Sequence, residues 1–367
     1  MEPGRIPAGV PSPEPLADTF RVYEVEETED GARYYGEPVE TADAVVERLG
    51  PFFRDRGYRI RLRRETGEHV LVATERSTSV DGVPWTNVAL FVATVGTTLY
   101  AGSRWYGIDV TTDPLAVANA WPFTLSVMGV LAVHELGHYA LSRYHGVEAS
   151  LPYFIPLPFN AIGTLGGVIR MRDNIPDRRS LFDIGAAGPL AGLVATVVVT
   201  AVGVSLPPVS APEGSLVAGI ELGYPLLIQV VATLAGEPLS YGPGRMVNPV
   251  VVGAWVGTFV TFLNLLPVGQ LDGAHVLRAL VGDRAGRLGP LVPLALLALA
   301  GYLVTVEGGP SASIWILWGL LTLVLSRVGG VSPLDDSPVG PGRRAVAVLT
   351  LVLGVACFTP VPIALTG

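Results

Sequence analysis

Apolar runs close to 20 residues long recur from Trp85 to the C-terminus, and they constrain this chain more than any other feature. A run of about 20 apolar residues can cross the hydrocarbon core of a bilayer as a helix. Only 15% of the residues are charged, against about 25% in a soluble domain. The pattern predicts a polytopic α-helical membrane protein. It excludes a soluble or collagen-like chain, and the single Cys357 excludes a disulfide-stapled one.

About seven transmembrane helices are predicted, and the arginines orient them. The apolar stretch 224–235 is too short to cross alone, so we expect it to be re-entrant or interfacial. With the N-terminal segment inside, eleven arginines flank the spans on the cytoplasmic side, and only Arg104 and Arg245 lie opposite. This bias fits the positive-inside rule. The predicted spans lie near 86–102, 118–143, 183–206, 249–273, 289–306, 311–327 and 345–365.

The residues before the first span predict a separate soluble part. Five prolines among the first 15 residues predict a disordered tail over 1–18. Residues 19–83 are predicted to form a small α+β domain of βαββ type, and residues 84–367 a transmembrane domain. Strands are expected at 20–25, 58–62 and 69–73, with a helix beginning near Thr41. This domain lacks a catalytic cluster, which favours docking or regulation.

The charge pattern bears on partners and location. The net charge is −8 and every basic residue is arginine, so a basic footprint for nucleic acid is absent. An acidic surface without lysine fits a high-salt cytoplasm; a GC-rich genome would also replace lysine by arginine. We therefore predict a multi-pass protein of the plasma membrane of a halophilic archaeon, with the N-terminal domain and the mouth of the site cytoplasmic.

Ionisable residues inside an apolar span are a functional hypothesis by default. The second span contains His134, Glu135 and His138 in the pattern His-Glu-x-x-His. Residues four apart share one helix face, so both imidazoles can bind one Zn²⁺. Glu135 lies about 100° round the helix and can reach a water molecule at the metal. The alternative is a pair of structural histidines with satisfied hydrogen bonds.

A catalytic zinc normally takes three protein ligands. Asp272 lies six residues before Arg278, and His134 lies nine before Arg143. At 1.5 Å per residue both lie roughly 10–14 Å from the cytoplasmic face. Asp272 is therefore the predicted third ligand of one Zn²⁺ per chain, and the alternative is a helix cap. His275 is expected to line the cytoplasmic mouth, or else to donate a hydrogen bond to a ligand.

Together with Asn264-x-x-Pro267 and Leu271-Asp272-Gly273, the His-Glu-x-x-His motif resembles that of the site-2 proteases, which are intramembrane zinc metalloproteases. Segments 152–156, 163–168 and 186–192 are similar to one branch, the ethylene-dependent gravitropism-deficient chloroplast proteases. Ala274 departs from the second glycine common in the family. The resemblance implies an endopeptidase that cuts transmembrane segments of membrane proteins in the bilayer, with zinc on His134, His138 and Asp272 and Glu135 as the catalytic base.

Substrate binding is predicted on two segments. A substrate helix must unwind before its carbonyls can be attacked, and an exposed strand edge could hold it extended. The glycine-rich segment 162–170, with Gly163, Gly166 and Gly167, is the predicted edge; the alternative is a cytoplasmic turn. The resemblance implies that Asn264 binds substrate backbone, or else it satisfies a neighbouring carbonyl.

A divalent-metal transporter is the alternative function for the His/Asp cluster. Such a transporter needs ligands near the midplane and access from both faces, often within repeated halves, and neither feature is found in this sequence. The identity of the substrate and the oligomeric state stay open.

Overall fold

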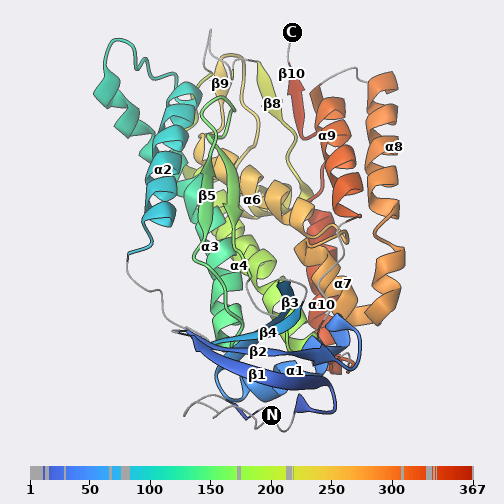
Figure 1. The fold of residues 1–367 in the computed structure, drawn as a ribbon. Helices are drawn as coiled ribbons and strands as arrows, with labels where there is room; N and C mark the ends of the chain where they lie inside the picture. Colours follow the sequence, from blue (N-terminus) through green and yellow to red (C-terminus); the bar gives the residue numbers. More distant parts are fainter. Residues whose placement is uncertain are drawn as a thin grey trace. The chain divides into compact units, whose positions relative to one another are not determined.

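The computed structural model describes residues 11–12, 16–28, 30–65, 68–75, 83–171, 175–211, 217, 219–306, 310–327, 333, 335 and 337–365 (Figure 1). The chain separates into two compact units, Met1–Asp81 and Gly82–Gly367. The first unit contains a sheet and one helix, and the second is mostly helical.

The first unit is a four-stranded antiparallel sheet with one helix. The strands follow the spatial order β1-β2-β4-β3. Buried side chains of the helix, Val45, Leu49 and Phe53, pack with Tyr34 and Leu71 of the sheet. The elements are β1 (Phe20–Thr28), β2 (Gly31–Pro38), α1 (Ala42–Arg54), β3 (Tyr58–Glu65) and β4 (Glu68–Glu75).

Two expectations for this unit are wrong. The unit is ββαββ rather than βαββ, because β2 was missed. One of the core-facing positions of β2 is Gly36, where a Cβ would stand 2.2 Å from the carbonyl oxygen of Arg21. This close contact between strands requires glycine at a position where the strand pattern would otherwise have an apolar side chain. The predicted tail over 1–18 ends earlier: Leu16 is fully buried, and the carbonyl of Pro11 accepts a hydrogen bond from the Tyr34 hydroxyl at 2.8 Å. Residues 1–10 and 13–15 lie outside the described residues.

The second unit is mostly helical, and among its described residues three helical stretches are long and apolar enough to cross a membrane: Pro114–Tyr144, Arg178–Ser205 and Arg284–Val306. Its helices are α2 (Trp85–Trp105), η2 (Pro114–Ala120), α3 (Trp121–Tyr144), α4 (Arg178–Ser205), α5 (Leu226–Ala235), α6 (Val250–Asn264), α7 (Asp272–Val281), η3 (Gly282–Arg287), α8 (Leu291–Val306), α9 (Pro310–Leu325) and α10 (Pro341–Ala356). Its strands are β5 (Tyr153–Pro156), β6 (Thr164–Val168), β7 (Val209–Ser210), β8 (Ile220–Leu222), β9 (Arg245–Met246) and β10 (Ile363–Leu365).

Two of the predicted spans are not continuous helices. The stretch 249–273 divides into α6 and α7, which end and begin at Asn264 and Asp272. Pro267 lies in the break and cannot donate a helical hydrogen bond. The stretch 345–365 is helical only to Ala356, because two prolines follow and residues 363–365 pair with β8 as strand β10. The short stretch 224–235 contains the ten-residue helix α5.

Small residues bring α3, α4 and α6 close together. A Cβ on Gly137 of α3 would stand 2.7 Å from the carbonyl oxygen of Ala187 on α4. A Cβ on Gly253 of α6 would stand 2.3 Å from the Ser126 hydroxyl on α3. Contacts of this kind let helix backbones approach closely within a membrane. These three helices form the frame that carries the site.

The segment between α3 and α4 forms a β-hairpin, Tyr153–Val168, which runs along α2 (Figure 1). Near the start of α2, the side-chain amide of Asn87 donates to the carbonyl of Leu151 at 2.9 Å. Further along, the Thr97 hydroxyl donates to Gly163, and at the end the Trp105 indole donates to Ala161, both at 2.7 Å. From Asn87 to Trp105 the helix rises about 27 Å, close to the thickness of a hydrocarbon core.

Candidate metal centre

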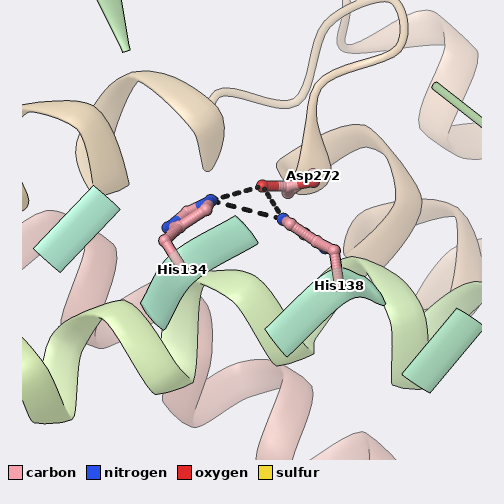
Figure 2. Close-up of side chains that lie close together, drawn as sticks. All are labelled: His134, His138 and Asp272. Carbon is pink, nitrogen blue, oxygen red and sulfur yellow. Dashed lines mark hydrogen bonds and ion pairs between the residues drawn. The ribbon is translucent and has the colours of Figure 1, made fainter. Parts of the chain in front are cut away.

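The structure brings two histidines and one aspartate together, as Figure 2 shows. His134 and His138 lie one turn apart on α3, and their Nε2 atoms are 3.3 Å from each other. Oδ2 of Asp272, the first residue of α7, lies 3.1 Å from Nε2 of His138 and 3.5 Å from Nε2 of His134. All three side chains are largely buried. Within the described residues, no other group of three or more His, Cys, Asp or Glu side chains is close enough to hold a metal ion.

The spacing of these three atoms suits a tetrahedral metal. Zinc binds imidazole nitrogen and carboxylate oxygen at about 2.0–2.1 Å, so neighbouring ligands of a tetrahedral ion lie about 3.3 Å apart. The three observed separations run from 3.1 to 3.5 Å. Two nitrogens and one oxygen are also a ligand set that catalytic zinc sites use, with the fourth position left open. The residues present therefore fit Zn²⁺.

The second nitrogen of His138 is held by the backbone. Nδ1 of His138 donates a hydrogen bond to the carbonyl oxygen of Ile184 at 2.8 Å. A carbonyl only accepts, so Nδ1 carries a proton, and Nε2, which faces Asp272, is the nitrogen left to bind a metal. Metal-binding histidines are commonly oriented in this way. Helix α4, which contains Ile184, thus orients one of the candidate ligands.

Glu135 lies beside strand β6. Its side chain is only 5% exposed. A Cβ on Gly167 of β6 would stand 2.7 Å from Cγ of Glu135, so only glycine fits there without displacing the carboxylate. The structure therefore brings Gly167 to the centre.

The other glycines of the hairpin have different surroundings. Gly163 packs on α2, where a Cβ would stand 2.5 Å from the carbonyl oxygen of Thr97. Gly166 has a φ of +108°, a conformation that L side chains rarely adopt, and no atom lies within 4 Å of its Cβ position. Gly166 thus has open space beside it, whereas Gly163 belongs to the contact with α2.

Asn264 also reaches the centre. It is the last residue of α6, and its side-chain nitrogen lies 3.1 Å from Nε2 of His134. The break between α6 and α7 therefore places Asn264 and Asp272 on the same cluster, from the two helix ends that flank it.

Two glycines of α4 complete the surroundings of the histidines and were missed as site residues. A Cβ on Gly188 would stand 2.0 Å from Nε2 of His138, and one on Gly192 would stand 2.9 Å from Nδ1 of His134. The two glycines are four residues apart and so lie on one helix face. Two glycines four residues apart indicate that another part of the chain packs closely on this helix face. The sequence does not show that the imidazole rings of the two histidines are what packs there.

His275 does not lie at an open mouth, which corrects that expectation. Its side chain is 2% exposed, and Nε2 has no hydrogen-bond partner within the described residues. Its Cβ lies against Gly185 of α4. Helix α7 is also held at its C-terminal end, because the buried side chain of Arg178 donates to the carbonyl of Ala279 at 2.7 Å.

A polar network joins α3, α4 and α10 outside the metal cluster. The guanidinium of Arg343 binds Asp183 through two hydrogen bonds of 2.8 Å. Nε2 of His145 lies 3.0 Å from the same carboxylate, and its Nδ1 lies 3.2 Å from the Ser180 hydroxyl. Asp183 precedes Ile184, so the network adjoins the carbonyl that orients His138.

Comparison with known proteins identifies the family. Residues 122–306, about half of the chain, match the model of peptidase family M50. The chain belongs to peptidase family M50. The match includes α3, α4, α6 and α7, and so contains every residue of the cluster. Together with the apolar helices, family M50 membership makes this chain a membrane protein.

Similar proteins support the predicted branch. The chain is 33% identical to the probable zinc metalloprotease EGY1, chloroplastic, of Arabidopsis thaliana, over 67% of this chain and 44% of that protein. It is 28% identical to the probable zinc metalloprotease EGY2, chloroplastic, of Oryza sativa subsp. indica, over 94% of this chain and 64% of the relative. The matches thus span about two fifths to two thirds of these relatives' lengths, and the resemblance to this branch is confirmed.

Proposed function

We propose that this chain is an intramembrane zinc-dependent endopeptidase, which hydrolyses peptide bonds within or near transmembrane segments of membrane proteins. The observation that carries the proposal is the convergence of His134, His138 and Asp272 to separations of 3.1 to 3.5 Å, in a chain of family M50. The family match gives the metal-transporter alternative no support.

The proposed division of labour follows from the positions of the side chains. His134, His138 and Asp272 would hold one Zn²⁺ per chain, which supplies a Lewis acid that polarises the scissile carbonyl and activates water. Glu135 takes a proton from the attacking water on its carboxylate and returns it to the leaving amine. Packing against Gly167 holds that carboxylate in place, and the Ile184 carbonyl keeps His138 in the tautomer that binds.

Strand β6 is the proposed substrate-binding edge. Its one partner strand among the described residues is β5. An unpaired edge at membrane depth must be satisfied by protein or water, and an extended substrate segment would satisfy it by strand addition. Gly166 leaves open space for a backbone, Gly167 next to it packs against Glu135, and Gly163 shapes the hairpin that presents the edge. Asn264 would bind a backbone group of the bound segment near His134.

We also propose seven membrane crossings: α2, α3, α4, the α6–α7 pair, α8, α9 and α10. Contacts between helices support this arrangement, because they place the start of α4, the end of α7 and the start of α10 on the same side of the membrane. Arg178 at the start of α4 contacts the end of α7, and Arg343 at the start of α10 contacts Asp183 of α4. These ends carry the arginine-rich flanks and would face the cytoplasm. The composition without lysine supports the plasma membrane of a halophilic archaeon as the location.

The test is zinc per chain in detergent-purified protein, combined with cleavage of model transmembrane substrates. Wild type should bind about one zinc, Asp272→Asn should lose it, and Glu135→Gln should keep it but lose cleavage. Asp113→Asn, an exposed helix cap on η2, is the control and should resemble wild type. Full zinc retention by Asp272→Asn would overturn the proposed ligand set, and cleavage by Glu135→Gln would overturn the proposed base.

A further inference from the structure

The last helix, α10, packs on two of the helices that form the candidate metal centre. Ala347 of α10 is fully buried in an apolar cluster with Phe182 of α4 and Val276 of α7. Helix α4 holds one candidate ligand through a backbone carbonyl, and α7 supplies another. Helix α10 lies outside residues 122–306, which match family M50. A helix beyond the matched region therefore contacts both parts of the centre.

A carboxylate near the start of α4 joins this helix to α10 and to α3. Asp183 accepts two hydrogen bonds of 2.8 Å from the guanidinium of Arg343 on α10. Nε2 of His145, the residue that follows α3, lies 3.0 Å from the same carboxylate. Two parallel bonds from one guanidinium fix the orientation of a carboxylate as well as its distance. Asp183 is therefore held both by α10 and by the end of α3.

This carboxylate lies next to the group that orients His138. The carbonyl of Ile184, the residue after Asp183, accepts the hydrogen bond from Nδ1 of His138 at 2.8 Å. His138 and His145 are about two turns apart along α3. The two histidines contact neighbouring residues of α4, so a shift of α4 along α3 would change both contacts.

Further along, α10 contacts the break between α6 and α7. A Cβ on Gly354 would stand 2.7 Å from Cδ1 of Leu265, the residue that follows Asn264. The contacts made by Arg343 and by Gly354 are about 16 Å apart along the axis of α10. Helix α10 is therefore fixed at two separate points against segments that carry residues of the centre.

We propose that the ion pair of Arg343 and Asp183 positions the metal centre. The pair fixes α4 on α3, and α4 in turn presents the Ile184 carbonyl to His138. The inference rests on the proposed zinc centre, but it concerns two residues outside the ligand set. The alternative is an ion pair that only stabilises the fold. A merely stabilising pair leaves the geometry of the bound metal unchanged when it is broken, whereas a positioning pair does not.

The experiment replaces zinc by Co²⁺ in the full chain, purified in detergent. Tetrahedral Co²⁺ absorbs visible light, and its bands change with the orientation of its ligands, so the spectrum reports the geometry of the site. Titration with free Co²⁺ gives the affinity in the same measurement. Wild type should show tetrahedral bands. Arg343→Gln should shift or weaken these bands and lower the cobalt affinity about 10-fold, the smaller end of the effect of disturbing a ligand's hydrogen-bond partner.

Two further variants separate the paired geometry from the charge. Arg343→Lys keeps the charge but cannot form the two parallel bonds, so both readouts should lie between those of wild type and Arg343→Gln. If Arg343→Gln does not fold, the change expected in Arg343→Lys provides the test, and its absence overturns the proposal. Arg344→Gln is the matched control, because it removes the same charge from an exposed side chain on the next residue of α10. It should resemble wild type.

Asn248→Ala is the control for stability. Asn248 lies beyond the opposite end of α4, where it accepts a hydrogen bond from the Tyr106 hydroxyl at 3.0 Å and donates one to the carbonyl of Pro207 at 3.1 Å. Its replacement should lower the stability of the second unit but leave the cobalt spectrum unchanged.

The outcomes distinguish this inference from the proposed function. An unchanged spectrum and affinity in Arg343→Gln would overturn the positioning role, and so would an equal change in Arg344→Gln or Asn248→Ala. A wild-type chain that binds no cobalt would overturn the proposed metal centre itself, and the positioning role with it.

Discussion

Gly188 of α4 makes room for the imidazole of His138. A Cβ at Gly188 would stand 2.0 Å from Nε2, the nitrogen that faces Asp272. No real Cβ contact is that short, so a methyl group there must displace either the ring or the helix. The space under the proposed metal therefore depends on the absence of one methyl group.

Gly188→Ala should weaken zinc binding about 10- to 100-fold, as expected when the support of a ligand is disturbed. The measurement is zinc content after dialysis against a buffered series of free zinc concentrations. Gly129→Ala on α3 is the matched control, because its Cβ would meet no atom within 4 Å. Wild-type zinc affinity in Gly188→Ala would contradict the proposed role of Nε2.

Gly167→Ala should reduce the proposed cleavage activity without reducing zinc binding. The added methyl would stand 2.7 Å from Cγ of Glu135 and would move the carboxylate. Since a positioned general base contributes about 10²–10⁴-fold, cleavage should fall by about 100-fold or more while zinc per chain stays unchanged. Leu165→Ala, an exposed neighbour on β6, should change cleavage less. Loss of zinc from Gly167→Ala would mean that β6 supports the metal rather than the base.

Arg343→Gln should destabilise the second unit by about 1 kcal/mol, since the guanidinium is partly exposed and its pairing is weakened by water. Asp183→Asn should cost more, because Asp183 also contacts His145. Equilibrium unfolding in mixed micelles measures both. The double variant should be less destabilised than the sum of the singles, because the pair interacts directly. Strict additivity would contradict a direct pair.

The first unit should lose stability in alkali through Tyr34. Burial of the hydroxyl raises the pKa of Tyr34 well above 10.0. A group whose folded pKa is raised stabilises fully below the unfolded pKa of about 10, and this contribution is lost as the pH rises above it. The chain has no lysine, so lysine titration does not overlap this range.

Tyr34→Phe should therefore reduce the alkaline loss, at a cost of about 1 kcal/mol near neutral pH for the hydrogen bond to Pro11. Hydrogen exchange of β2 and β4 amides, corrected for the intrinsic pH dependence of exchange, gives the opening free energy on both sides of pH 10. An unchanged pH slope in Tyr34→Phe would assign the loss to another group.

Much of the metal cluster could be predicted, because its residues are recognised by their spacing on one helix or by their depth in the membrane. Helical spacing alone puts His134 and His138 on one face. Counting residues from the flanking arginines puts Asp272 at a similar depth, and the structure brings its carboxylate to 3.1 Å from His138. Both arguments need only helix geometry and the position of the membrane surface.

The rest depends on tertiary contacts that a sequence pattern does not contain. The stretch from Asn264 to Asp272 is apolar enough to pass for helix, but it breaks at Pro267 and turns at Gly269, which has a φ of +60°. A Cβ on Gly269 would stand 2.7 Å from the carbonyl oxygen of Leu325 on α9, a contact between distant parts of the chain. Strand β2 was missed for a similar reason, because Gly36 fills an inward position against a neighbouring strand.

The hydrogen bonds along α2 have a mechanical consequence. Asn87, Thr97 and Trp105 fasten the hairpin to this helix at its start, its middle and its end. We therefore expect α2 and the hairpin to move together, so that a tilt of α2 would also shift β6. Since β6 contacts Glu135 through Gly167, such a tilt would change the space around the proposed catalytic base. A force applied at the N-terminal end of α2 would thus lower the rate of the proposed cleavage without moving any of the proposed metal ligands.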